Sequence, residues 1–288
     1  MPKHLFPFFL LSILLWTSCS NPLSPNIAAT VQVSISSTQT EEAKLLPMLS
    51  PTPFLTPMPV DLRSVYSEIS GLRNTRTIIF NVSQTGDNPS QPISNTVEHI
   101  LTGLGLEVVQ DPALSDGSLT ISMNGTGVLY TYDNGIACYT KAEYDGLLEF
   151  GSRSGTSSKI QLEGDYMPLI ATSCPKEPSD APFELTWPEV ILEGFCKLWG
   201  PWPVVIGLED ENSVVRRAAS SVLGVGECRP PDQAIPAMIQ ALIRANREND
   251  KIMANNLASL LRVITDEYQC QTEDPSCFQA WWEKYQYK

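Results

Sequence analysis

The chain of 288 residues has little histidine and a marked deficit of basic residues. It contains two histidines, too few for a histidine-rich metal centre, and His4 lies in the expected signal segment. It carries 19 Lys plus Arg against 32 Asp plus Glu, a formal net charge of −13, with no cluster of basic residues. Because a phosphate backbone is bound by a basic face, this charge balance argues against a nucleic-acid partner.

Motifs of catalysis and metal binding are also missing. The sequence contains no C-x-x-C pair, no G-x-x-x-x-G-K-[ST] phosphate loop and no G-x-S-x-G nucleophile elbow. The segment "SRSGTSS", from Ser152 to Ser158, is predicted to be a hairpin loop, and His99 a surface or half-buried helix residue. We therefore predict no catalytic residue, no metal site and no cofactor, in a protein that is not an enzyme.

The first residues are typical of an export signal. "MPKHLFPFFLLSILLWTSCS" has a basic start, a short apolar run and small residues up to Cys19, with a core too short to span a membrane. Its end resembles a bacterial lipobox, although Trp16 stands where leucine is usual. This resemblance implies a signal over residues 1–19 and a lipid such as palmitate on Cys19. The alternative is an ordinary secretory signal.

Residues 20–60 are rich in proline, serine and threonine and show no sustained apolar period. Such a composition cannot bury enough surface to fold, so it predicts a disordered tether. The remaining chain exceeds the usual size of one domain, which predicts two.

Seven cysteines suit an oxidising compartment. With Cys19 lipidated, six remain, an even number that favours disulfides over the alternative of a metal site. Many pairings are open to six cysteines, and the order of the predicted domains favours three. These are Cys138 with Cys174, Cys196 with Cys228, and Cys270 with Cys277.

Residues 61–181 are predicted to form an α+β domain, an antiparallel sheet with one helix. "RTIIFNVSQ" alternates as a strand, "SNTVEHILTGLG" has helical spacing, and two β-rich runs flank the turn pair Asn134-Gly135. Tyrosines on these strands, among them Tyr130, Tyr132 and Tyr144, are interpreted as cross-strand packing, with a ligand-lining surface as the alternative.

Residues 182–288 change to a period of about 3.6 residues, which predicts an all-α region. "PVVIGLED" from Pro203 matches "PAMIQALI" from Pro236, and "LGVG" matches "LRVI" later in the chain. "VVRRAASSVLG" and "DQAIPAMIQAL" resemble the HEAT-like repeats shared with bacterial phycobilisome lyases. The resemblance implies an α-solenoid, ending in a capping helix whose aromatic residues could alternatively form an exposed patch.

The resemblance also implies that Arg216 and Arg217 belong to the scaffold, paired with acids such as Glu209 or Asp210, rather than to a ligand clamp. A solenoid presents an extended face that suits protein ligands. The expected protein-binding residues on that face are Arg216, Arg217, Ser220, Asn255, Asn256 and Ser259.

The sequence therefore predicts a lipid-anchored extracytoplasmic bacterial protein that binds or scaffolds an unidentified extracytoplasmic protein. One alternative is an envelope-assembly lipoprotein that binds lipid or glycan through the α+β domain. The other is an enzyme resembling a bilin lyase, against which export from the cytoplasm argues.

Overall fold

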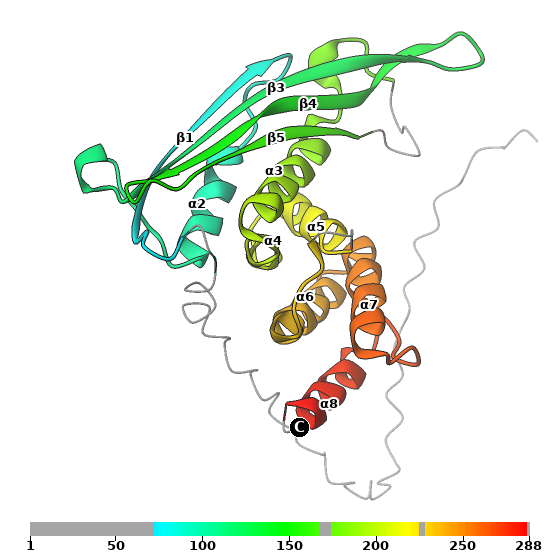
Figure 1. Ribbon diagram of the computed structural model, residues 1–288. Coiled ribbons are helices and arrows are strands. Elements are labelled where there is room, and N and C mark those ends of the chain that lie inside the picture. The colour runs from blue at the N-terminus through cyan, green and yellow to red at the C-terminus, as the bar shows by residue number, and fades with distance from the viewer. Residues whose placement is uncertain (1–68, 70–71, 167–173, 225–227, 287–288) are drawn as a thin grey trace, which may run out of the picture. The chain divides into compact units, whose positions relative to one another are not determined.

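A five-stranded mixed sheet occupies the middle of the chain, and most of the helices follow it (Figure 1). This computed structural model describes residues 69, 72–166, 174–224 and 228–286. The strands are β1 (Thr77–Gly86), β2 (Glu107–Val108), β3 (Gly117–Thr131), β4 (Ala137–Ser152) and β5 (Ser157–Tyr166). The helices are α2 (Ile93–Gly103), α3 (Phe183–Trp199), α4 (Trp202–Gly207), α5 (Ser213–Val222), α6 (Ile235–Arg247), α7 (Lys251–Thr265) and α8 (Pro275–Tyr285).

The strand order is β2-β1-β3-β4-β5. β1 pairs in parallel with both β2 and β3, whereas β3, β4 and β5 form an antiparallel meander. The prediction of an antiparallel sheet is therefore wrong for β1 and β2. The physical reason is the connection through α2. A helix between two strands carries the chain back to the end of the sheet where the first strand began, so the next strand runs in the same direction.

The strands bury one face and expose the other. In β3, Leu119, Ile121 and Met123 are buried, while the residues between them are partly or fully exposed. α3 packs on the buried face against β4 and β5. Gly164 in β5 permits this approach, because a Cβ there would overlap the side chain of Val190 on α3.

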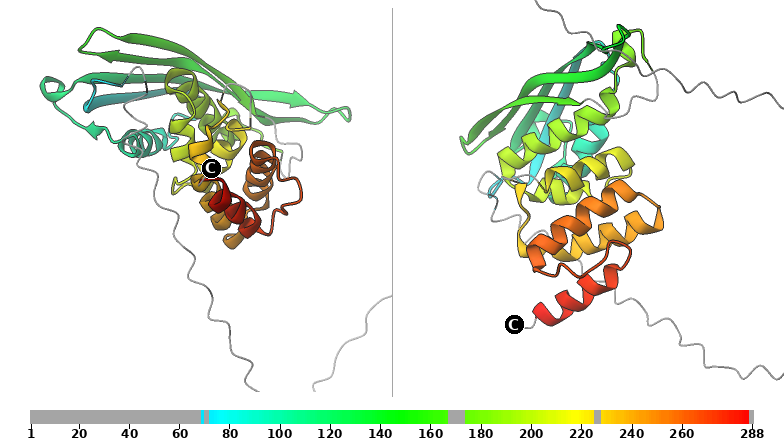
Figure 2. Two further views of the ribbon diagram at one scale, coloured as in Figure 1. Left: turned by 60° about the horizontal axis from the view of Figure 1, so that its bottom comes forward. Right: turned by 90° about the vertical axis from the view of Figure 1, so that its right-hand side faces the viewer.

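The prediction of a separate all-α HEAT-like solenoid after an α+β domain is also wrong. α3 packs on the sheet and on α5, and α2 contacts α4 (Figures 1 and 2). Sheet and helices therefore share one hydrophobic core, whose residues run from Ile69 to Phe278. The physical reason lies in α3, where Ile191, Leu192 and Phe195 are all buried. A helix that buries residues around most of its surface lies between two layers and cannot begin an independent repeat array.

All three favoured disulfides are confirmed. They join Cys138 to Cys174, Cys196 to Cys228, and Cys270 to Cys277. Disulfides of this number are characteristic of an oxidising, extracytoplasmic compartment. None of the described helices is both long and apolar enough to cross a membrane. The predicted signal, the lipidation site Cys19 and the tether lie outside the described residues.

Candidate functional site

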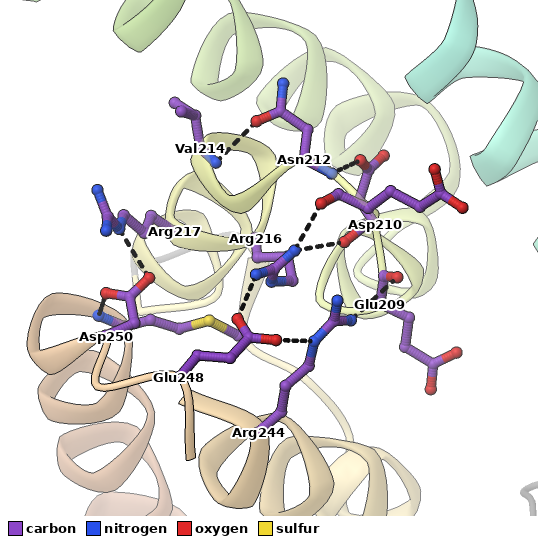
Figure 3. Close-up of polar contacts among 11 residues, drawn as sticks. Glu209, Asp210, Asn212, Val214, Arg216, Arg217, Arg244, Glu248 and Asp250 are labelled. Carbon is purple, nitrogen blue, oxygen red and sulfur yellow. Dashed lines mark hydrogen bonds and ion pairs between the residues drawn. The ribbon is translucent and has the colours of Figure 1, made fainter. Parts of the chain in front are cut away.

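The predicted protein-binding face on α5 and α7 contains an ion-pair network that joins successive helices (Figure 3). The Arg216 side chain is only 5% exposed. Its Nη1 donates to the backbone carbonyls of Asp210 and Glu211 at 2.9 and 2.8 Å, and its Nη2 lies 2.5 Å from the Glu248 carboxylate. All these partners belong to the protein itself, so Arg216 fastens the start of α5 to the end of α6.

Neighbouring residues extend the same network. Arg244 pairs with Glu248 at 2.9 Å, and the Arg244 and Arg216 guanidiniums hold the pKa of the Glu248 carboxyl below its usual range. Arg217 pairs with Asp250 at 2.7 Å, and Asp250 also accepts from the backbone N–H of Met253, so it caps α7. Of the acids predicted to pair with these arginines, Asp210 accepts from Arg216 through its backbone carbonyl, and the Glu209 carbonyl accepts from Arg244 instead.

The six predicted binding residues do not converge on one open surface. Ser220 is buried; its hydroxyl donates to the carbonyl of Arg217 and accepts from the side chain of Asn256. Asn255 and Ser259 are exposed on α7. In this arrangement Arg216 and Ser220 hold the helices together, whereas Asn255 and Ser259 are exposed and Arg217 and Asn256 are half-buried.

A second region, the hairpin between β3 and β4, extends past the strands on either side (Figure 1). β1 ends opposite Gly125, and β5 ends opposite Ala142. Residues 126–131 and 137–141 therefore pair with no other described strand and form a two-stranded ribbon. Beyond Gly125 the outer edge of β3 has no strand beside it among the described residues, although Pro178 and the Asp87 carboxylate lie against it at Gly127.

The tip of this hairpin gathers large apolar side chains in the open. Leu129 is 51% exposed, Tyr130 42%, Tyr132 36% and Ile136 48%. The rings of Tyr130 and Tyr132 meet edge to face at 4.9 Å, so the two side chains support each other without reaching the core. We call these four residues the hairpin tip.

The turn at the end of the hairpin was predicted from Asn134-Gly135 and is confirmed. Gly135 has a φ of 80°, which this turn requires and which glycine adopts without strain. The Asn134 side chain accepts from the backbone N–H of Ile136, and Tyr132 N–H donates to the Ile136 carbonyl at 2.8 Å. The turn thereby fixes the register of the ribbon.

The ribbon is tied down near both of its ends, since Cys138 lies opposite Tyr130 at the outer end and Gly127 lies opposite Ala142 at the base. On β4, Cys138 is bonded to Cys174, and Tyr139 N–H donates to the Pro175 carbonyl at 3.0 Å. On β3, Gly127 N–H donates to the Asp87 carboxylate at 2.9 Å. The hairpin tip is therefore carried on a braced arm.

The described residues hold no group of three or more His, Cys, Asp or Glu side chains arranged to bind a metal ion. Of the tyrosines interpreted as cross-strand packing, Tyr144 is buried with its ring against Phe183 of α3, whereas Tyr130 and Tyr132 are exposed. Sequence reasoning missed the hairpin tip because exposure there depends on where the neighbouring strands stop. A usable signal was present, since "VLYTYDNGIACYT" is apolar at consecutive positions on both sides of its turn.

No family model matches the chain, and a search of curated proteins returns no match. The resemblance of residues 202–264 to HEAT-like repeats therefore stays a prediction, and function has to be inferred from the surfaces of the protein itself.

Proposed function

We propose that this is a non-catalytic, exported protein-binding lipoprotein that engages an extracytoplasmic protein through the hairpin tip. The observation that carries the proposal is the exposure of Leu129, Tyr130, Tyr132 and Ile136 on a braced two-stranded arm. Tyrosine is enriched among the residues that dominate binding energy at interfaces. An anchored arm also loses little conformational freedom on binding, which favours affinity.

The edge of β3 beyond Gly127 favours a protein over a lipid bilayer as the partner. Backbone N–H and C=O groups on a free strand edge can pair with a strand of another protein, as in β-strand addition. In hydrocarbon the same groups would find no partner, at a cost of several kcal/mol each. Asp133 at the turn and the net charge of −13 further oppose insertion into an anionic membrane surface.

The expected strength of the contact follows from the side chains. Complete burial of one large apolar side chain contributes about 1.5–3 kcal/mol. The four side chains are 36–51% exposed, so burial of what remains open yields about 3–5 kcal/mol in total. The association cost of about 4–15 kcal/mol is as large or larger, so pairing along the strand edge has to supply the rest. The partner is therefore expected to offer both an apolar pocket and a strand edge.

The proposal is tested with a photoreactive amino acid placed at Tyr132 of the full chain in the cells that produce it. A discrete protein adduct is expected, and placement at Tyr268, which is 67% exposed on the helical side, provides the control. Adducts of equal yield at both positions, or adducts with lipid alone, would contradict a protein-binding tip.

A quadruple serine variant makes the test quantitative, with affinity measured for the partner so identified. The variant replaces the hairpin tip residues Leu129, Tyr130, Tyr132 and Ile136. The matched control replaces four other exposed apolar residues, Leu114, Ile252, Val263 and Tyr268. Binding is expected to fall at least about a hundredfold in the first variant only.

We also propose that Cys19 carries the lipid and that residues 20–60 act as the tether. The lipobox-like end of the signal and the extracytoplasmic disulfides support this. Metabolic labelling with a palmitate analogue is expected to mark the full chain and to be lost in Cys19→Ser. Equal labelling of both chains would refute lipidation at this residue.

A further inference from the structure

The C-terminal helix α8 and the loop that follows α7 line a half-open pocket of about 380 Å³. Its volume lies near the lower end of the range of ligand pockets, about 300–1,000 Å³. The lining residues are Glu267, Gln269, Cys277, Ala280, Trp281, Lys284 and Tyr285. The Cys270–Cys277 disulfide joins the loop to α8 and so holds the two sides of the pocket together.

One side of the pocket is aromatic. Trp281 and Tyr285 stack with ring centroids 4.6 Å apart and ring planes 13° from parallel. The Tyr285 hydroxyl donates to the Asp232 carboxylate at 3.2 Å, which fixes this ring from the adjoining part of the chain. The two rings form a rigid wall, and an aromatic face attracts positively polarised C–H groups.

The other side carries three polar groups of different kinds. Glu267 supplies a carboxylate, Gln269 a carboxamide and Lys284 an ammonium group. Gln269 Nε2 donates to Glu267 Oε2 at 3.0 Å, which leaves further acceptor capacity on the carboxylate. Among the described residues Lys284 has no ion-pair partner within 4.0 Å, although Glu267 lines the same pocket and offsets its charge.

We propose that this pocket binds a neutral pyranose saccharide. A sugar ring has a face of C–H groups that can lie on Trp281 and a rim of hydroxyls that both donate and accept hydrogen bonds. These hydroxyls can satisfy the acceptor Glu267 and the donor Lys284 at once. The opposite charges of these two residues favour an uncharged ligand over an acidic one.

A proline-rich peptide is the competing ligand, since proline rings also dock on aromatic side chains. It fits the polar groups less well. Proline has no backbone N–H, so a polyproline segment offers carbonyl acceptors for Lys284 but few donors for Glu267. The pocket chemistry therefore favours the saccharide. The pocket and the hairpin tip share no residues, so a negative result at one site does not affect the proposal for the other.

The test is calorimetric titration of the purified, oxidised full chain with cellotetraose and with the tetrasaccharide of N-acetylglucosamine. At least one is expected to bind. Trp281→Ala should weaken it by about tenfold or more, because the wall is lost. Glu267→Ala, a change in a loop that leaves the core intact, should weaken it by about fivefold, the effect of one hydrogen bond.

Trp282→Ala is the matched control, because Trp282 belongs to the same helix but does not line the pocket. It should change the affinity by less than about twofold. Three results would overturn the proposal: no binding of either saccharide at millimolar concentration, equal loss in Trp281→Ala and Trp282→Ala, or binding of decaproline in place of both sugars.

Discussion

Replacement of Arg216 tests whether the ion-pair network is part of the scaffold. The guanidinium makes three hydrogen bonds, and its side chain is 5% exposed, so Arg216→Ala leaves two carbonyls and part of the Glu248 carboxylate without their donor. Removal of one partner from a buried ion pair costs about 3–5 kcal/mol. Because Glu248 is itself 37% exposed and keeps Arg244, we expect the lower end, about 3 kcal/mol.

Arg217→Ala is the matched control in the adjacent position of the same helix. Its side chain is 42% exposed and makes one ion pair, with Asp250. Asp250 is itself only 6% exposed but keeps its hydrogen bond from the Met253 N–H, so about 1–2 kcal/mol is expected. Urea unfolding followed by tryptophan fluorescence gives both free energies of unfolding. In thermal unfolding, Arg216→Ala should lower Tm by about 6–12 °C, at about 2–4 °C per kcal/mol for a chain of this size.

The conservative variant Arg216→Lys separates charge from geometry. A lysine keeps the positive charge but lacks the planar fork that reaches two carbonyls and a carboxylate together, so it should recover less than half of the lost stability. If Arg216→Ala costs no more than Arg217→Ala, or if Arg216→Lys restores full stability, the interpretation of Arg216 as a buried fastener is wrong.

Two further predictions concern Gly127, at the base of the two-stranded ribbon, and Glu189, a half-buried acid on α3. Gly127→Ala should cost about 1–3 kcal/mol in urea unfolding, because its Cβ would overlap the Pro178 carbonyl, whereas Gly151→Ala, which has room for a Cβ, should be nearly neutral. Burial raises the pKa of the Glu189 carboxyl, so its folded pKa exceeds the unfolded value and stability is lost as pH rises through the folded pKa. Glu189→Gln should therefore raise the free energy of unfolding at pH 7 but not below about pH 4.5, and a gain of equal size from the exposed Glu184→Gln would contradict this.

Local features of the fold were predictable from the sequence because their causes are local. The turn at Asn134-Gly135, the first strand around Ile78 and the helix around Val97 all follow from neighbouring residues. The parallel pairing of β1 with β3 was missed, because it joins Ile78 to Gly117 across an intervening helix and strand. Periodicity reports which face of an element is buried and is silent about the element that buries it.

In the helical region, too, the sequence pattern did not identify which elements pack together. The repeated prolines and alanines led to a solenoid, but α3 buries Trp187, Val190 and Phe195 against two different neighbours. The arginine partners Glu248 and Asp250 were also missed. They lie about one repeat away in sequence, and the nearer acids Glu209 and Asp210 offered a local explanation that the structure replaces with backbone carbonyls.

The placement of the disulfides connects the scaffold to the two proposed binding surfaces. Cys138, which is bonded to Cys174, lies directly opposite Tyr130 of the hairpin tip, and Cys270–Cys277 joins the two sides of the aromatic pocket. Only Cys196–Cys228 joins two residues that are both buried in the shared core. A disulfide beside an exposed surface adds little buried area to the core, but it restricts the conformational freedom of that surface in the unbound protein. Two of the three disulfides thus have the position expected of crosslinks that preorganise a binding surface.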